Sequence, residues 1–121
     1  MMMRGIRGAT VASENTKEAI LSASLELLKK IIELNPSMNK EDICSVIFTL
    51  TEDLDAVFPA QASRELDWDH VPLMCARELP VPGSLPKCIR VLVHWNTSKL
   101  QSEIRHVYLK AASTLRPDLI Q

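Results

Sequence analysis

The chain has 121 residues, of which 46% are hydrophobic and 24% are charged, with a formal net charge of -1. This length suits one domain with a hydrophobic core and is too short for two, so we expect a single domain over residues 1–121. The near balance of charge argues against a nucleic-acid footprint and against a polybasic membrane patch.

The cysteines predict a reducing compartment. There are three, Cys44, Cys75 and Cys88, and no C-x-x-C pair. This pattern suggests neither a disulfide framework nor a zinc ribbon, so we expect a cytoplasmic protein. The N-terminal residues lack the continuous apolar run of a signal peptide, and no run reaches the roughly 20 apolar residues of a membrane span.

Residues 2–11 are predicted to form the opening strand, with two glycines that let backbone or ligand come close. Arg4 and Arg7 are three positions apart and should face opposite sides of this strand. At most one of them can therefore share a site. Arg7, which lies between Ile6 and Gly8, is the better candidate for a pocket.

A helix is predicted from Thr16 to Leu34. Asn15 and Glu18 have the spacing of a capping box, and Asn35 followed by proline ends the helix. Helical spacing forms a wide apolar stripe, which we interpret as core, from Ile20, Leu21, Leu25, Leu28, Ile31 and Ile32.

A buried second strand is predicted over residues 43–50, after a short turn over residues 40–42 that Asn39 caps. A polar break over residues 51–55 follows. Its acidic residues indicate a solvated connection to the next element.

A short second helix should end at Leu66, with Pro59 at a position where a helix can start. A third strand is then predicted over residues 71–76, leading to Glu78. The connection over residues 80–86 is rich in proline and too short for a crossover helix, so we expect the next strand to run antiparallel.

The best strand in the sequence covers residues 87–95. Strict alternation assigns its residues to two faces, one with Ile89, Val91, Val93 and Trp95 and the other with Cys88, Arg90, Leu92 and His94. The first face is core. On the second face Arg90 needs an anion, because an unpaired guanidinium among apolar neighbours costs several kcal/mol. That anion is either a carboxylate of the same chain or a ligand.

A last helix is predicted from Lys99 to Leu115, with Tyr108 beside its core stripe and able to turn its hydroxyl towards a site. Residues 116–121 should form a flexible tail. The element order predicts an α+β domain with a mixed β-sheet covered by helices on one face. The other sheet face is also apolar and is expected to pack against further copies of the chain.

No motif for covalent or metal chemistry is present. The sequence has no G-x-S-x-G, no H-E-x-x-H and no P-loop, and His70, His94 and His106 lack the spacing of metal ligands. What remains is a set of cations and donors that would suit a small polyanion, namely Arg7, Arg90, Arg64, Arg116, Glu78, Cys75 and Tyr108. Each also has a structural interpretation: Cys75 as core, Tyr108 as an amphipathic edge residue, Arg64 as a solvated side chain and Arg116 as a helix C-terminal charge.

Five segments together resemble the monofunctional chorismate mutases of the Bacillus-type trimeric pseudo-α/β-barrel class, a ferredoxin-like variant. They are Met-Met-Arg-Gly-Ile-Arg-Gly-Ala-Thr at residues 2–10, Asp-Ala-Val-Phe-Pro-Ala from residue 55 with Arg64-Glu65-Leu66, Val71-Pro72 with Cys75 and Glu78, Lys-Cys-Ile-Arg-Val at 87–91, and Ile-Arg-His-Val-Tyr-Leu at 104–109 with Leu115-Arg116-Pro117-Asp118-Leu119. Their order along nearly the whole chain makes the resemblance specific.

The resemblance implies a homotrimer that rearranges chorismate to prephenate in phenylalanine and tyrosine biosynthesis, by conformer selection and electrostatic stabilisation, without metal or cofactor. By this resemblance Arg90 would reach the ether oxygen, Arg7 and Tyr108 the substrate's side-chain end, and Glu78 with Cys75 the ring hydroxyl. The pocket, lying between subunits, would be lined and bordered by Phe58, Leu115, Arg64 and Arg116.

Some features depart from the family pattern. Gln61 stands where the family commonly has lysine, Pro82-Gly83-Ser84 replaces a glycine pair, and the tail is short. Strict alternation also places Cys75 and Glu78 on opposite strand faces, so both can line one site only if the strand breaks between them. A second hypothesis is a non-catalytic trimeric module that binds small carboxylates.

Overall fold

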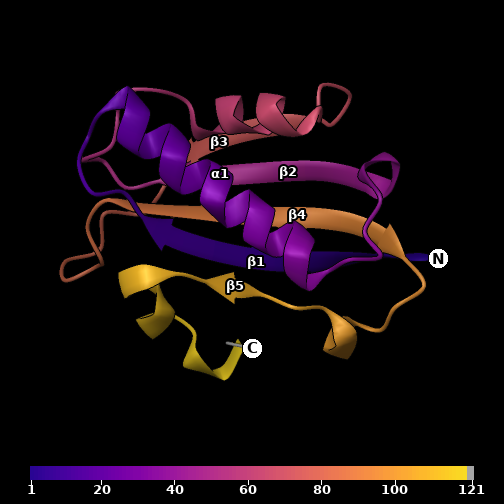
Figure 1. The fold of residues 1–121 in the computed structure, drawn as a ribbon. Coiled ribbons are helices and arrows are strands. Elements are labelled where there is room, and N and C mark those ends of the chain that lie inside the picture. The colour runs from indigo at the N-terminus through magenta and orange to yellow at the C-terminus, as the bar shows by residue number, and fades with distance from the viewer. Residues whose placement is uncertain (120–121) are drawn as a thin grey trace.

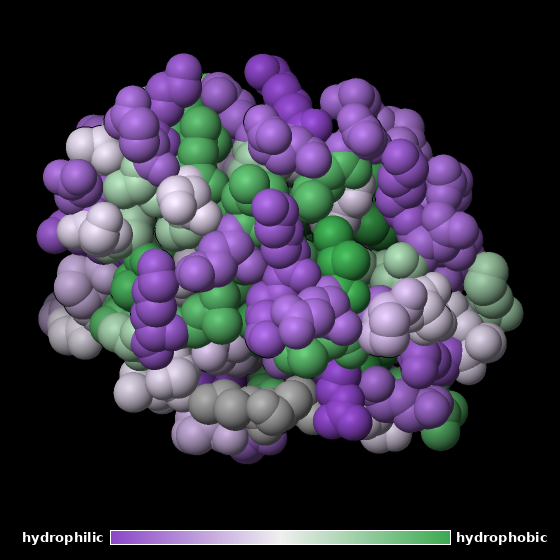
Figure 2. Space-filling view, in the orientation of Figure 1, coloured by the Kyte–Doolittle hydropathy of each residue, from purple (hydrophilic) through white to green (hydrophobic). Residues whose placement is uncertain are grey.

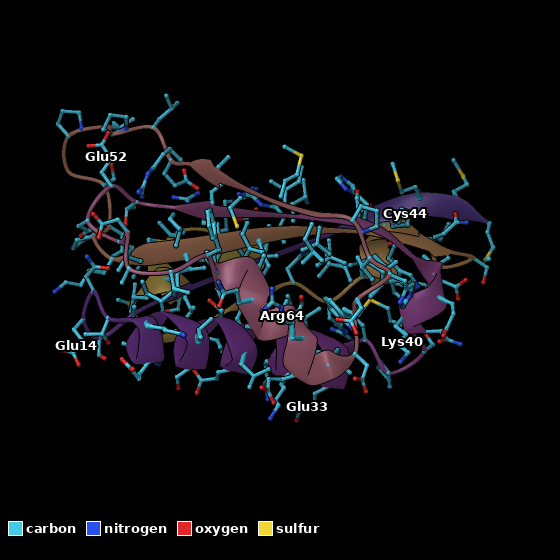
Figure 3. The ribbon with its side chains drawn as sticks, turned by 90° about the horizontal axis from the view of Figure 1, so that it is seen from above. Glu14, Glu33, Lys40, Cys44, Glu52 and Arg64 are labelled. Atoms are coloured by element: carbon cyan, nitrogen blue, oxygen red, sulfur yellow. The ribbon has the colours of Figure 1, made fainter. Side chains whose placement is uncertain are left out.

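The computed structural model describes residues 1–119 and shows a mixed five-stranded sheet with strand order β3-β2-β4-β1-β5 (Figure 1). The strands are β1 (Met2–Val11), β2 (Ile43–Leu50), β3 (Leu73–Arg77), β4 (Cys88–Thr97) and β5 (Val107–Tyr108). The helices are α1 (Lys17–Leu34) and the 3₁₀ segments η1 (Lys40–Asp42), η2 (Pro59–Leu66), η3 (Gln101–Glu103), η4 (Lys110–Thr114) and η5 (Pro117–Leu119). Seen from above, α1 and η2 lie on the same side of the sheet (Figure 3), as predicted.

The central strand is β4, which pairs antiparallel with both β1 and β2. Its residues Ile89, Val91 and Val93 are buried in one core with Leu27 and Ile31 of α1, as the alternation predicted. The residues between them, Arg90, Leu92 and His94, are half-buried on the opposite face of the sheet, which we call the open face.

The crossover from β2 to β3 makes these strands parallel neighbours and places η2 on the helical side of the sheet. The segment from β3 to β4 then reverses direction, as expected, but the two strands are not neighbours, because β2 lies between them. The proline-rich loop therefore spans the end of β2. Arg77 ties this end together by donating to the carbonyl oxygens of Thr51 and Leu54 at 2.7 and 2.8 Å.

The span predicted for α1 is correct, but its cap is not the predicted one. Thr16 caps the helix, with its hydroxyl accepting from the backbone N–H of Ala19 at 3.1 Å. Asn15 instead accepts from the backbone N–H groups of Asp55 and Ala56 and donates to the Asp55 carboxylate. The amide side chain is used to hold a distant turn, which local spacing could not reveal.

The predicted helix over residues 99–115 is wrong. The chain there forms η3, β5 and η4, and β5 pairs parallel with β1 through Val107 opposite Gly8. This pairing satisfies backbone groups on the outer edge of β1, which a helix would have left open. The buried Asn35 side chain fixes the approach by exchanging two hydrogen bonds, of 3.0 and 3.1 Å, with the backbone of Arg105.

The face of the molecule that carries α1 is largely hydrophilic, with smaller hydrophobic areas between the polar side chains (Figure 2). This agrees with an amphipathic helix whose apolar stripe, including Ile20, Leu27 and Leu28, faces the sheet. Among residues 1–119, no helix has the length and apolar character needed to cross a membrane.

Candidate active site

A cavity of about 470 Å³ opens on the open face of the sheet. It is lined by Arg7, Gly8, Ile47, Thr49, Glu78, Arg90, Val91, Leu92 and Tyr108. Four of the predicted site residues, Arg7, Glu78, Arg90 and Tyr108, thus meet here although they come from four separate segments of the chain.

One row across the sheet explains much of this convergence. Thr49 of β2 and Ala9 of β1 lie opposite Arg90 on either side of β4, and Ala9 in turn lies beside Tyr108 of β5. Residues in register on neighbouring strands project to the same face. Ala9 itself is completely buried in a cluster with Tyr108 and Ala112, so Arg90 and Tyr108 border the cavity but Ala9 does not.

Arg7 reaches the same face from two positions earlier on β1. Its register partner on β4 is Leu92, which also lines the cavity. Arg4 lies three residues before Arg7 and donates from Nε to the carbonyl oxygen of Lys99, away from the cavity. Only Arg7 of this pair shares the site, in agreement with the prediction.

Glu78 follows directly after β3 and is held by its backbone N–H, which donates to the carbonyl oxygen of Leu50 at 2.9 Å. Its carboxylate accepts a hydrogen bond from the Thr49 hydroxyl. The same oxygen, Oε2, lies 3.4 Å from Nε of Arg90. Arg90 is therefore paired with a carboxylate of its own chain.

The Arg90 guanidinium nevertheless keeps an unused donor. Its Nε is buried and has no hydrogen-bond partner within residues 1–119, because its separation from Glu78 gives an ion pair without hydrogen-bond geometry. A buried, unpaired charged donor is costly unless something else accepts from it. The interpretation of Arg90 as paired with a carboxylate of its own chain is therefore confirmed, and its binding of a ligand stays a prediction.

Tyr108 is a neutral donor in this site. It is only 8% exposed, and burial raises the pKa of its phenol, while the charges of Arg7, Arg116 and Arg90 act in the opposite direction. The net upward shift keeps the hydroxyl protonated at neutral pH.

The C-terminal segment packs beside Tyr108. Leu115 and Leu119 contact a small cluster of Ala9, Tyr108 and Ala112, joined by Leu85 from the proline-rich loop. Arg116 forms a forked ion pair with Asp118, with N···O distances of 2.9 and 2.7 Å. The predicted flexibility of residues 116–119 stays a prediction, and residues 120–121 lie outside the described part of the chain.

Three predicted site residues are elsewhere in this single chain. Cys75 lies opposite Phe48 in the sheet and packs against the core on the helical side. Because β3 continues unbroken to Arg77, Cys75 does not line the cavity together with Glu78. Phe58 and Arg64 line a separate depression at η2, where Figure 3 shows Arg64 in the helical layer.

Thr49 and His106 contact the predicted site residues but were not themselves predicted to do so. Thr49 was assigned only to a buried strand, because its position opposite Arg90 depends on a register that one strand cannot reveal. His106 was considered only as a metal ligand, but its Nδ1 accepts from the backbone N–H of Arg7 at 2.9 Å. Burial lowers the pKa of this imidazole, and the charges of Arg7 and Arg116 lower it further.

A larger open groove of about 630 Å³ runs between α1 and η4, but it contains none of these residues. Its charges are mixed, and an ion pair of 3.5 Å between Lys110 and Glu26 lies at its border. The cavity around Arg90 is therefore the better candidate for a site that binds a compact anion.

Comparisons with known proteins agree on one family. The family model described as chorismate mutase type I matches residues 3–119. The chain is 55% identical over 118 residues to chorismate mutase AroH of Thermus thermophilus, covering 98% of this chain and 97% of that protein. It is 50% identical over 120 residues to AroH of Bacillus subtilis strain 168, with 98% and 94% covered. A solved chorismate mutase from Clostridium thermocellum superposes with a TM-score of 0.88 at 50% identity, covering 91% of this chain and 97% of that one.

The single tyrosine of the chain allows a direct test of the site's burial. We expect the phenol of Tyr108 to ionise above its ordinary pKa of 10.0 in the folded protein, because burial disfavours the phenolate. Its contribution to folding stability is then complete below pH 10 and is lost as the pH rises through the folded-state value. Alkaline titration followed by phenolate absorbance measures this, with Tyr108→Phe as the blank. A reversible midpoint at or below the ordinary value, in protein that is still folded, would show that the phenol is solvated.

Proposed function

Since the chain belongs to the type I chorismate mutase family and is a chorismate mutase, an isomerase, we propose that the cavity around Arg90 is its catalytic site. The observation that carries the proposal is the position of Arg90, a permanently charged side chain that lines this cavity and forms an ion pair of 3.4 Å with Glu78. It lies in one cavity with Arg7, Glu78 and Tyr108.

The rearrangement of chorismate to prephenate breaks a carbon–oxygen bond while a carbon–carbon bond forms within one molecule. It requires no nucleophile and no proton transfer. The ether oxygen becomes more negative as its bond to carbon breaks, so a fixed cationic donor at that oxygen stabilises the transition state more than the ground state. We assign this role to Arg90.

The other cavity residues would fix the substrate's conformation. The substrate is a dicarboxylate, and Arg7 with the neutral hydroxyl of Tyr108 would bind its side-chain end, leaving Glu78 to accept from the ring hydroxyl. Thr49 supports this assignment, because its hydrogen bond to the Glu78 carboxylate limits the rotation of that side chain. Holding the two reacting ends together in a chair-like conformer lowers the entropic part of the barrier.

We propose that Phe58, Arg64 and Cys75 act on a neighbouring subunit's cavity within a homotrimer. Within one chain, η2 lies on the helical side of the sheet and the cavity on the open face. Large apolar side chains are exposed on both sides, Met74 on the open face at 71% and Phe58 beside η2 at 66%. Such exposure supports burial against further copies. Gln61 at η2 would bring no cation to this rim.

We also propose a cytoplasmic location. It is supported by the three free cysteines of the described residues, two of which, Cys44 and Cys75, are at least partly accessible. Such thiols persist most readily in a reducing compartment.

The proposed site is tested first by adding purified protein to chorismate and following the loss of the substrate's ultraviolet absorbance. We expect turnover without additives, insensitivity to a chelator, and nearly constant kcat from about pH 6 to 8, because permanently charged arginines and an ionised Glu78 do the chemistry. Binding of chorismate without loss of absorbance would instead favour the carboxylate-binding module. A bell-shaped kcat profile centred near neutrality would contradict the assigned roles.

Replacing Arg90 should affect kcat far more than substrate binding. Loss of one such donor typically lowers the rate on the order of 10²–10³-fold, about 3–4 kcal/mol, since the ether oxygen carries little charge in the ground state. Arg90→Lys keeps the charge but loses the fork, so it should recover only part of this rate. Steady-state kinetics of both variants provide the measurement.

Arg7→Ala is the matched control for Arg90. It removes a contact to a carboxylate that is charged throughout the reaction, so its effect should appear mainly in KM. If Arg90→Ala raised KM and left kcat within about a few-fold of the parent value, Arg90 would be a substrate clamp and the mechanism would be wrong.

The trimer is tested by light scattering, which should give about three times the 13.6 kDa chain mass at micromolar concentration. Mixing inactive Arg90→Ala and Phe58→Ala chains after dissociation should then restore part of the activity. Mixed trimers would contain sites with both parent residues, one from each subunit. A monomeric mass, or no recovery in mixtures that do exchange subunits, would contradict sites shared between subunits.

A further inference from the structure

The outer edge of β1 is completed by side chains on either side of its short pairing with β5. The two strands pair at Gly8 with Val107 and at Ala9 with Tyr108. One residue earlier, the N–H of Arg7 donates to the ring Nδ1 of His106 at 2.9 Å. Further along the edge, the side chain of Gln101 binds both the N–H and the carbonyl of Gly5, at 3.1 and 2.7 Å.

We propose that His106 is a positioning residue for Arg7, which it holds at the cavity as a neutral hydrogen-bond acceptor. The proposal rests on the proposed function, because Arg7 matters through the substrate carboxylate that it would bind. A neutral imidazole accepts at Nδ1 only when its proton is on Nε2. Protonation would place a second N–H against the N–H of Arg7 and break the bond.

The surroundings of the ring favour the neutral form. Burial lowers the pKa of His106, and the guanidinium groups of Arg7 on β1 and Arg116 in the C-terminal segment lower it further. Asp118 is engaged by Arg116, and the phenol of Tyr108 on β5 is uncharged. The end of α1 reaches this region through Asn35, which is also uncharged and binds the backbone of Arg105. The ring is therefore a neutral acceptor at pH 7, where the enzyme would need it.

The expected kinetic consequence is confined to binding. A displaced Arg7 would bind the substrate carboxylate less tightly. Because that carboxylate is charged in both the ground state and the transition state, KM should rise while kcat stays nearly constant. The wild-type KM should rise on acidification with an apparent pKa below 6.5, the ordinary value for histidine. The direct electrostatic effect of a protonated ring is the opposite, because an added cation would strengthen anion binding and lower KM.

The test compares His106→Asn with His106→Leu, two side chains of similar size. The amide oxygen of asparagine can take the place of Nδ1 as acceptor, but leucine has none. We expect His106→Leu to raise KM by about 5–30-fold, the equivalent of one lost hydrogen bond, with kcat within about two-fold. His106→Asn should keep KM within about two-fold of the parent and abolish its rise at acidic pH.

Two controls separate this effect from other causes. His70→Asn and His94→Asn remove the two imidazole rings outside the Arg7 contact, and both should keep the acidic rise in KM. Hydrogen exchange at the amide of Arg7 gives a readout without substrate. Its protection factor, the intrinsic rate divided by the measured rate at the same pH, should fall in His106→Leu and in the wild type at acidic pH, but not in His106→Asn. This arm distinguishes failure of the positioning role from failure of the proposed function.

Three results would overturn the proposal. The first is a KM that falls on acidification. The second is equal behaviour of the asparagine and leucine variants. The third is an unchanged protection factor at the Arg7 amide when His106 is protonated or replaced by leucine. If the leucine variant fails to fold, the wild-type pH series and His106→Asn still decide.

Discussion

The charge of Arg90 in the middle of the central strand is the constraint on which the rest of the structure depends. Removing a guanidinium from water costs several kcal/mol unless a counter-charge is near. Glu78 supplies it at 3.4 Å, and it can do so because β3 runs parallel to β2 and ends just before it. That arrangement requires the crossover through η2, which in turn covers one side of the sheet with helix and leaves the open face for the site.

Two small residues of β1, Gly8 and Ala9, allow close packing on the two faces of the sheet. On the helical face, an added Cβ at Gly8 would lie 3.1 Å from side-chain atoms of both Ile31 and Val91, so α1 packs as closely as it does because that atom is missing. On the open face, Ala9 is completely buried and packs with Tyr108 and Ala112. Arg7 lies directly before these two residues. The same short segment therefore provides close packing on the helical face and a cavity-lining arginine on the open face.

Backbone groups at the outer edge of β1 explain why residues 99–115 do not form the predicted helix. The segment after β4 is drawn along this edge, where Gln101, His106 and the two residues of β5 satisfy in turn the groups that β4 does not reach. Arg7 is thus carried by a strand whose inner edge pairs with β4 and whose outer edge is held by β5 together with the side chains of Gln101 and His106. Titration or substitution of those side chains can act on Arg7 without any contact to the substrate.

The sequence by itself determined the elements with strong periodicity and the face on which each of their residues lies. The spans of β1, α1 and β2, the core face of β4, and the opposite orientations of Arg4 and Arg7 were all predicted correctly, because alternation along one strand or helix is a local property. The family resemblance likewise identified Arg7, Glu78, Arg90 and Tyr108, which the fold brings into one cavity.

Only the tertiary structure decided which elements pair and in what register. The spacing of Ile104 and Val107 fits a helix as well as a buried extended segment, and the unpaired edge of β1 selected the second. Pairings between segments that are distant in the sequence decide three contacts. They are the position of Thr49 beside Arg90, the contact of His106 with Arg7, and the packing of Cys75 against the core. Local patterns carry no record of such pairings, because their free energy is gained only when the complete sheet has formed.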